Sequence, residues 1–343
     1  MTTDPTAPDP ATLAPGRRVP RRVLVTGCAG FIGSHLTESL LADGVEVVGV
    51  DCFNANYGRE QKLANLHQAL DWRAFQFIPL DLARGELEEL VADVDVVFHL
   101  AAEPGVRSSW GDRFGRYVTN NILATQQLLR ALEAAPGARL VYASSSSIYG
   151  QAETLPTRED TPADPVSPYG LTKLSGEHLC NVYHANHGLE VASLRYFTVF
   201  GPRQRPDMAF NIFCRAAQAG ERITIHGDGH QTRDFTYVAD VVAATRAAGV
   251  MPIRSGSAYN VGGGLRASLR DVLETIAELA GRPLDVEYGM HVAGDVRDTG
   301  AETTKARTHL GFAPRTSLRE GLAAEFEWLA AQAATSAAER AAA

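Results

Sequence analysis

Short apolar runs alternate with longer segments of helical periodicity through the first 200 residues of the chain. Between the runs, segments such as Ser34 to Ala42 and Tyr117 to Glu133 place apolar residues three or four positions apart, the spacing of an amphipathic helix. This alternation predicts an α/β fold with a parallel, doubly wound sheet that binds ligands at the carboxyl ends of its strands. The runs expected as strands are 21–26, 45–50, 75–80, 94–100 and 138–144.

The pattern changes after Gly201. A helix is expected over 208–220 and a strand over 222–226, whereas the run from Tyr259 to Gly264 is expected to return to the first sheet. This predicts a smaller C-terminal α/β domain that binds the substrate. The expected division is a disordered tail at 1–20, a dinucleotide-binding domain at 21–200 to which segments around 235–262 return, a substrate domain at 201–330, and a tail or frayed helix end at 331–343.

A glycine-rich turn follows the first strand and opens the first helix. Gly27 permits a tight turn, Gly30 lets the backbone approach a pyrophosphate, and Gly33 lets the helix pack closely on the strand. Asp51 ends the second strand, where a carboxylate would accept ribose hydroxyls and repel a 2′-phosphate. Together these features predict a Rossmann-type domain that binds NAD in preference to NADP.

Composition narrows the function further. The 343 residues carry a formal net charge of −8, so no basic excess is available to neutralise the phosphates of a nucleic acid. Cys28, Cys52, Cys180 and Cys214 lack the paired spacing of a zinc site, and no metal is expected. No signal peptide or membrane-spanning run is visible, and we expect a cytoplasmic protein.

A phenol and an ammonium are expected on one face of a helix that starts after Pro168. Tyr169 and Lys173 are four residues apart, and a cation beside a tyrosine lowers the pKa of its hydroxyl toward neutrality. The same spacing also occurs by chance on amphipathic helices. The strand before it delivers four serines, Ser144 to Ser147, and is expected directly beside the first strand. His99 is expected to be a packed core histidine.

Four motifs together resemble the extended short-chain dehydrogenase/reductases. They are Thr-Gly-x-x-Gly-x-x-Gly at 26–33, the serine run, Tyr-x-x-x-Lys, and the stretch from Arg195 to Arg203. Within that group the chain is similar to the NAD-dependent nucleotide-sugar epimerase/dehydratase family over 21–328. The resemblance implies that Tyr169 takes the proton of the sugar 4-hydroxyl while C4 gives hydride to NAD. It also implies that Lys173 lowers the tyrosine pKa and holds the nicotinamide ribose, and that Ser145 bonds to the sugar O4.

The resemblance extends to the binding residues. Cofactor contacts are expected from Gly27, Ala29, Gly30, Phe31, Ile32, Gly33, Asp51, Asn54, Asp81, Leu82, Leu100, Ala101, Ala102, Asn120, Ser144, Tyr169, Lys173, Tyr196 and Val199. Substrate contacts are expected from Arg107, Ser145, Ser146, Ser147, Tyr169, Thr198, Arg205, Ile225, Arg233, Asp295 and Arg297. For Arg233 the alternative is a surface ion pair with Asp234, and for Asp81 and Leu82 it is the end of a strand.

The residues after Ser145 point to the reaction. Dehydratases of the family place Asp-Glu, and decarboxylases a Glu, where this chain has Ser146 and Ser147. The resemblance therefore implies C4 epimerisation through a 4-keto sugar. The segment from Phe197 to Ala209 is closest to that of UDP-glucuronate 4-epimerases, whereas UDP-glucose 4-epimerases usually have Asn in place of Thr198. A UDP-glucose or related epimerase and a non-catalytic dinucleotide-sensing protein are the alternatives.

A homodimer is also expected from the resemblance. The segments Tyr117 to Glu133 and Gly170 to His187 carry apolar stripes, and in relatives the matching helices form a four-helix interface. The stripes alone are equally consistent with packing inside one chain.

Overall fold

The computed structural model describes residues 19–54, 57–135, 137–264, 266–290 and 294–342. The tail expected over 1–20 lies outside these residues except for its last two positions.

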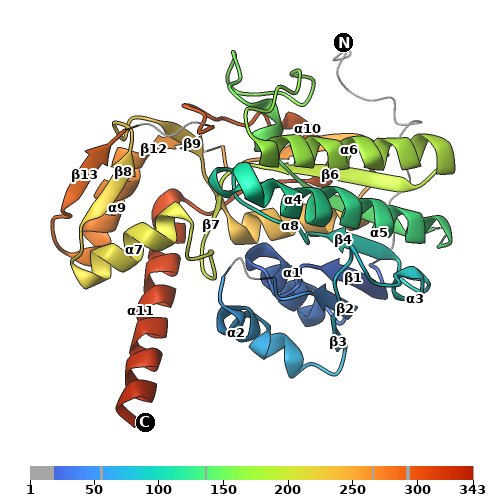
Figure 1. Cartoon of the computed structure of the whole chain (residues 1–343), viewed down its shortest axis with the longest axis horizontal. Coiled ribbons are helices and arrows are strands. Elements are labelled where there is room, and N and C mark those ends of the chain that lie inside the picture. Colours follow the sequence, from blue (N-terminus) through green and yellow to red (C-terminus); the bar gives the residue numbers. More distant parts are fainter. Residues whose placement is uncertain (1–18, 55–56, 136, 265, 291–293, 343) are drawn as a thin grey trace.

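Seven parallel strands form the central sheet, in the order β3-β2-β1-β4-β5-β6-β11 (Figure 1). The strand order reverses direction at β1, which pairs with β2 on one side and β4 on the other. This confirms the predicted doubly wound fold, including the late return of β11 to the sheet. The strands are β1 (Arg22–Thr26), β2 (Glu46–Asp51), β3 (Phe75–Pro79), β4 (Val96–His99), β5 (Arg139–Ser145), β6 (Glu190–Tyr196) and β11 (Ser257–Val261).

Helices cover both faces of this sheet because its strands are apolar on both sides. Val23 and Val25 of β1 pack toward one helical layer, and Leu24 packs toward the other. The first layer contains α1 (Phe31–Ala42), α2 (Arg59–Leu70), α8 (Val238–Val250) and α10 (Thr304–Leu310). The second contains α3 (Glu88–Val91), α5 (Ala124–Glu133) and α6 (Pro168–His187).

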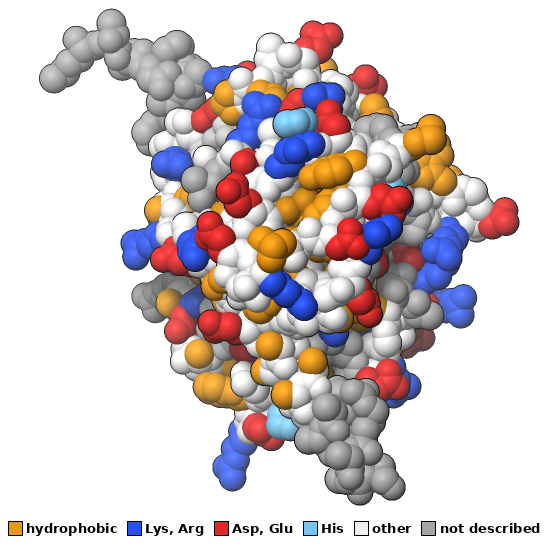
Figure 2. Space-filling model, turned by 90° about the vertical axis from the view of Figure 1, so that its left-hand side faces the viewer, with side chains coloured by type: hydrophobic (Ala, Val, Ile, Leu, Met, Phe, Trp, Pro, Cys, Tyr) orange, Lys and Arg blue, Asp and Glu red, His pale blue; other side chains and the backbone are white. Residues whose placement is uncertain are grey.

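A second apolar core lies at the other end of the molecule, at the left in Figure 1. Phe210, Phe213, Ile223, Ile276 and Leu322 are buried there. Figure 2 views this end, and basic and acidic side chains are interspersed on its surface. Its helices are α7 (Ala209–Ala219), α9 (Leu269–Ala280) and α11 (Leu318–Ala342). Its strands pair as β8 (Ile223–His226) with β13 (Val286–Gly289), β9 (Thr232–Asp234) with β12 (Arg266–Ser268), and β7 (Val199–Phe200) with β10 (Thr236–Tyr237).

One expectation about the large sheet needs correction. The strand that carries the serines, β5, pairs with β4 and β6, so β4 separates it from β1. The helix expected from Tyr117 to Glu133 is confirmed, and it contains a stretch of π-helix. A π-helical turn at Val118–Leu123 lies between α4 (Phe114–Tyr117) and α5, and its wider turn carries Asn121, whose amide donates to the Glu103 carbonyl (3.0 Å).

Near the C-terminus, α11 continues to Ala342, so residues 331–342 form the end of a helix, and Ala343 lies outside the described residues. Short 3-10 turns complete the described chain at Arg107–Ser109, Gly111–Arg113 and Ser146–Tyr149.

Candidate active site

The glycine-rich turn forms a narrow cradle between β1 and α1. Gly27 has a φ of +73°, and its N–H donates to the Val50 carbonyl (2.7 Å). A Cβ on Gly33 would lie 2.1 Å from the Gly27 oxygen, so the close approach of helix and turn requires glycine there. The N-terminus of α1 has no side-chain cap, which leaves its first N–H groups available to an anion. The turn therefore fits the pyrophosphate of a dinucleotide.

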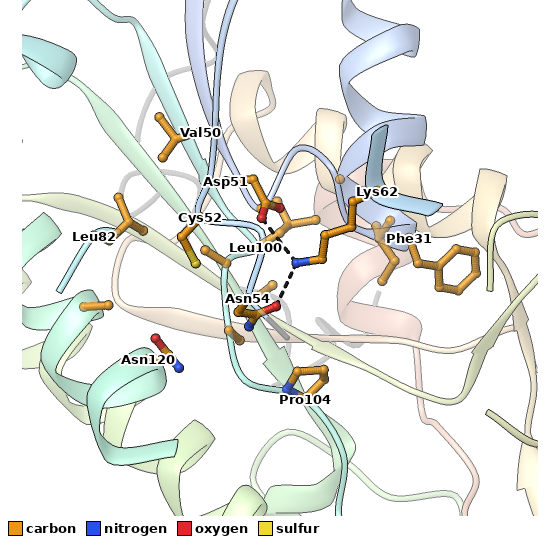
Figure 3. A pocket seen from close by; sticks show the side chains of 18 of the residues that line it. Phe31, Val50, Asp51, Cys52, Asn54, Lys62, Leu82, Leu100, Pro104 and Asn120 are labelled. Atoms are coloured by element: carbon orange, nitrogen blue, oxygen red, sulfur yellow. Dashed lines mark hydrogen bonds and ion pairs between the residues drawn. The ribbon is translucent and has the colours of Figure 1, made fainter. Parts of the chain in front are cut away.

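The end of β2 holds a buried ion pair (Figure 3). Lys62 of α2 places its Nζ 3.3 Å from Asp51 and donates to the Asn54 side chain (2.7 Å). Asp51 and Lys62 are both more than nine-tenths buried. Because Lys62 balances the carboxylate, a preference for NAD over NADP cannot rest on the charge of Asp51 alone.

The catalytic candidates meet at the carboxyl end of β5. Ser167 caps α6 by accepting the Gly170 N–H (3.1 Å), so the helix starts where the sequence predicts. Tyr169 and Lys173 follow, one turn apart. The Ser145 hydroxyl bonds to Tyr169, and the Lys173 Nζ donates to the Ala143 carbonyl (2.8 Å). The structure therefore brings Ser145, Tyr169 and Lys173 together.

The acid–base properties of these groups follow from their surroundings. Burial raises the pKa of Tyr169, whereas the bond from Ser145 and then the charge of Arg205 lower it. Burial lowers the pKa of Lys173 to about 8. Arg205 is therefore a cation that lowers the pKa of Tyr169, in addition to the lowering effect expected from Lys173. The Lys173 ammonium itself is directed at the Ala143 carbonyl.

Most of the expected cofactor residues line one cavity above the sheet. Ala29 and Val199 do not line it and are buried, and the Ala29 carbonyl accepts the Asn65 amide (3.0 Å). Tyr196 lines the cavity while its hydroxyl bonds to Thr245 (2.8 Å). The expected residues that line it are Gly27, Gly30, Phe31, Ile32, Gly33, Asp51, Asn54, Asp81, Leu82, Leu100, Ala101, Ala102, Asn120, Ser144, Tyr169, Lys173, Tyr196 and, of the substrate set, Arg205.

Ser144 and Arg205 line this cavity together with Tyr169, and the Ser145 hydroxyl bonds to Tyr169. The Ser145 hydroxyl accepts the Ser147 N–H (3.1 Å) and bonds to its hydroxyl (3.1 Å). Ser146, Ser147 and Thr198 are partly exposed. The Arg205 guanidinium forks onto Asp207 with bonds of 3.0 and 2.9 Å. An anionic group next to Tyr169 would share this guanidinium with Asp207.

A second cavity lies in the smaller lobe and contains Arg233, Asp295 and Arg297. Arg233 donates to the carbonyls of Thr232, Val296 and Arg297 at 2.5–2.9 Å. Its expected alternative partner, Asp234, instead accepts the backbone N–H groups of Gly264 and Ala301.

Two further substrate candidates flank this second cavity. Arg107 reaches across from the large sheet and donates to Asp295 (2.6 Å). The Ile225 side chain is 1% exposed and packs in the small core, so only its backbone could face a ligand.

The remaining candidates have structural roles. His99 is buried between Thr26 (2.7 Å) and Thr125 (3.0 Å), and burial lowers its pKa to about 3, which confirms the core histidine. The four cysteines are free, and three are buried. Among the described residues, no helix could cross a membrane, and no group of three or more His, Cys, Asp or Glu could hold a metal ion.

Comparisons with known proteins show the family of this chain. The NAD dependent epimerase/dehydratase family matches residues 23–262. The chain belongs to this family.

Individual members of the epimerase/dehydratase family are similar over almost their whole length. The uncharacterized UDP-glucose epimerase YtcB of Bacillus subtilis is 44% identical over 90% of this chain and 98% of its own. The UDP-glucuronate 4-epimerase of Thermodesulfobacterium geofontis is 37% identical over 89% and 95%. The crystal structure of UDP-glucuronic acid 4-epimerase from Bacillus cereus with UDP-glucuronic acid and NAD has a TM-score of 0.88, 43% identity, and coverage of 91% and 99%.

In this NAD-dependent epimerase, residues that the sequence reasoning missed also line the cofactor cavity. Lys62 comes from a helix that no local motif marks, and Tyr57 and Pro104 come from loops. Of the missed residues, only Cys52 could have been found from the sequence, because it directly follows Asp51 at a strand end. The cavity residues that were missed are Val50, Cys52, Tyr57, Lys62, Leu80, Pro104, Ala124 and Ala143.

Proposed function

We propose that this chain is a UDP-glucuronate 4-epimerase, which interconverts UDP-glucuronate and UDP-galacturonate. The observation that carries the proposal is the cation beside the catalytic tyrosine, since Arg205 and Tyr169 line the same cavity. A hexuronate differs from a hexose by the carboxylate at C6, and a guanidinium is suited to bind it. The similarity to the Bacillus cereus and Thermodesulfobacterium enzymes supports this substrate.

In the proposed reaction Tyr169 accepts the proton of the sugar 4-hydroxyl, which Ser145 orients through its hydroxyl. NAD, when bound, accepts hydride from C4 and returns it to the opposite face. Tyr169 then gives the proton back to the O4 of the inverted sugar. Lys173 holds the nicotinamide ribose, and the glycine turn holds the pyrophosphate.

The lining of the cavity also bears on the fate of the 4-keto sugar. A 4-ketouronate is a β-keto acid, and it loses carbon dioxide unless its carboxylate is kept out of alignment with the carbonyl. Arg205, Ser146, Ser147 and Thr198 would hold that carboxylate. Since Ser146 and Ser147 stand where dehydratases and decarboxylases carry carboxylates, epimerisation is the outcome the side chains support.

The UDP moiety is assigned to the second cavity. Arg233 and Arg297 supply guanidinium groups for the diphosphate, and Asp295 supplies a carboxylate for ribose hydroxyls. Arg107 lies beside Asp295 at the entrance between the two lobes.

UDP-glucose is the alternative substrate, and the name of the Bacillus subtilis relative favours it. The reaction at C4 is the same for both sugars, so the two proposals differ only in what Arg205 and its hydroxyl neighbours bind.

We also propose a cytoplasmic homodimer. Val118 and Leu123 on the π-helical turn and Leu171 and Val182 on α6 are each 38–54% exposed, although they are apolar. Figure 1 shows these segments side by side on the outer side of the sheet. A four-helix interface would cover them. Replacing Leu171 and Val182 with Glu should give a monomer in light scattering after size exclusion. The four free cysteines suit a reducing compartment.

Proton NMR tests the substrate. The purified protein is incubated separately with UDP-glucuronate and with UDP-glucose, without added reductant, and the anomeric signals are followed. Formation of UDP-galacturonate, with much slower turnover of UDP-glucose, is the expected result. Faster turnover of UDP-glucose would assign the alternative substrate, and a pentose product would mean that the enzyme decarboxylates.

A further inference from the structure

Three side chains of α6 are bonded to three consecutive residues of β5. The Ser145 hydroxyl bonds to Tyr169, and the Ala143 carbonyl accepts the Lys173 ammonium (2.8 Å). One helical turn further, the Ser144 hydroxyl donates to the Glu177 carboxylate (2.5 Å). Because residues four apart share a face of a helix, Glu177 extends the row that Tyr169 and Lys173 begin.

The Glu177 carboxylate is fixed on its other side by Arg195 of β6. Arg195 forks onto both oxygens, at 3.0 and 2.8 Å, and both side chains are at least nine-tenths buried. Arg195 is itself held by the Tyr149 hydroxyl (2.7 Å) and the Glu159 carbonyl (2.9 Å). The position of Glu177 is therefore set by two neighbouring strands as well as by its own helix.

This layer contains two buried cations, Lys173 and Arg195, around one carboxylate. Burial lowers the pKa of Lys173 to about 8, whereas Cys180 and then Glu177 act in the opposite direction. Cys180 itself is neutral at pH 7 because burial raises its pKa, and the same holds for Tyr142 on β5, while burial lowers the pKa of His99 on β4 to about 3. Tyr169 on α6 also faces this layer, and it is the phenol that exchanges a proton with the sugar in the proposed reaction. Among the described groups that raise the pKa of Lys173, Glu177 is the one carboxylate.

We propose that Glu177 is a positioning residue of the epimerase: its carboxylate, fixed between Ser144 and Arg195, keeps the Lys173 side chain an ammonium in the cavity beside Tyr169. Without this carboxylate, Lys173 would stand near the uncompensated charge of Arg195 in a buried site. The ammonium would then lose its proton at a lower pH, and its hold on the nicotinamide ribose would weaken. The inference rests on the proposed role of Lys173 but not on the identity of the sugar.

The test compares the pH dependence of kcat for Glu177→Gln and wild type, as NAD-containing enzymes. Glu177→Gln preserves the shape of the side chain but removes its charge. The alkaline limb of the profile is expected to move to lower pH by about one unit, because the loss of a nearby opposite charge shifts a buried pKa by this order. Arg195→Lys, which keeps the cation, should leave the alkaline limb where it is in wild type.

A second readout is independent of turnover. The rate at which bound NAD leaves the protein is followed by fluorescence between pH 6.5 and pH 9.5, and Glu177→Gln should release NAD faster starting at a lower pH than wild type. If Glu177 only stabilises the fold, its replacement would lower the melting temperature and leave both pH dependences in place, and the proposal would be wrong.

Glu177→Asp covers the case in which Glu177→Gln does not fold. It keeps the charge but withdraws the carboxylate by one methylene, so a smaller shift in the same direction is expected. No shift in either readout would overturn the proposal. A protein that shows the NAD-release shift but turns over neither UDP-glucuronate nor UDP-glucose would instead contradict the proposed function.

Discussion

The cofactor cavity and the cavity of the smaller lobe differ in what their charged side chains are bonded to. In the cofactor cavity, Asp51 is paired with Lys62 and the Lys173 ammonium is bonded to a backbone carbonyl, all within the large sheet and its helices. In the cavity of the smaller lobe, Arg233 is bonded to carbonyls of the segment that carries Asp295, and Asp295 is bonded to Arg107 from the other lobe. The two bonds named in the cofactor cavity can persist when a ligand enters, whereas the fork of Arg205 onto Asp207 in the same cavity would be shared with a sugar carboxylate.

The bonds in the cavity of the smaller lobe must partly exchange, since the proposed diphosphate contacts are already occupied. The comparison separates a rigid catalytic end, where substitutions change the chemistry, from an adaptable nucleotide end, where they change affinity. Four predictions test this difference between the two ends, in order from the largest expected effect to the smallest.

Replacing the catalytic phenol should have the largest effect. Tyr169→Phe is expected to reduce kcat by about 10²–10⁴-fold, because a positioned proton acceptor contributes this order to the rate. The binding of UDP should be little changed, since the hydroxyl lies outside the second cavity. NMR of the product and calorimetry with UDP measure the two effects.

Tyr183→Phe on the same helix is the matched control. Its hydroxyl accepts the Gln126 amide (3.2 Å) at the far end of α6. We expect its activity to stay within about twofold of wild type, as for most substitutions outside a core or a site. A Tyr169→Phe enzyme that retained more than a tenth of the activity would remove the tyrosine from the proposed mechanism.

The next effect is on substrate choice. Arg205→Gln should lower kcat/KM for UDP-glucuronate by about 10–100-fold, the value of a charge-assisted bond to a carboxylate. The kcat/KM for UDP-glucose should change much less. Each variant is assayed at its own pH optimum, because Arg205 also lowers the pKa of Tyr169. Arg205→Lys keeps the charge without the fork and should fall between. Equal losses for both sugars would argue for the UDP-glucose alternative.

A stability effect is expected where the smaller lobe meets the large one. Glu325 of α11 is fully buried and accepts the Gly201 N–H (2.9 Å), and burial raises its pKa from 4.5 to about 8. The folded protein therefore binds one more proton than the unfolded chain between these values. The contribution of this bound proton to the free energy of unfolding is fully present below pH 4.5. It is lost as pH rises toward 8, by an amount on the order of a few kcal/mol.

Glu325→Gln should remove most of this pH dependence, because the amide cannot ionise. Melting temperatures from pH 5 to pH 9 measure it, and the exposed neighbour Glu327→Gln provides the control. If the two variants melted with the same dependence on pH as wild type, Glu325 would be ionised or solvated in the folded protein.

The sequence predicted the rigid end better than the adaptable one. The signals at this end are backbone conformation for Gly27 and Gly33 and helical spacing for Tyr169 and Lys173. Both signals can be recognised from residues that are close together in the sequence. Lys62 could not be found in this way, because its partner Asp51 lies eleven positions away on another element and is met only through tertiary packing.

The same reason explains the errors. The separation of β5 from β1 depends on which strand lies between them, and Arg205, whose charge lowers the pKa of Tyr169, comes from a loop 36 residues later. The substrate role of Ile225 could not be judged from the sequence either, since the strand pattern does not say that its side chain enters the small core.

The smallest effect should come from the contact between the lobes. Arg107 is 52% and Asp295 26% exposed, so removal of their ion pair should cost no more than about 1 kcal/mol of stability. Arg107→Gln, Asp295→Asn and the double variant are compared by melting and by calorimetry with UDP. If the pair opens to admit the nucleotide, each single change weakens UDP binding a few-fold and the two effects add. If the losses do not add, the ion pair persists in the complex, and the smaller lobe is as rigid as the catalytic end.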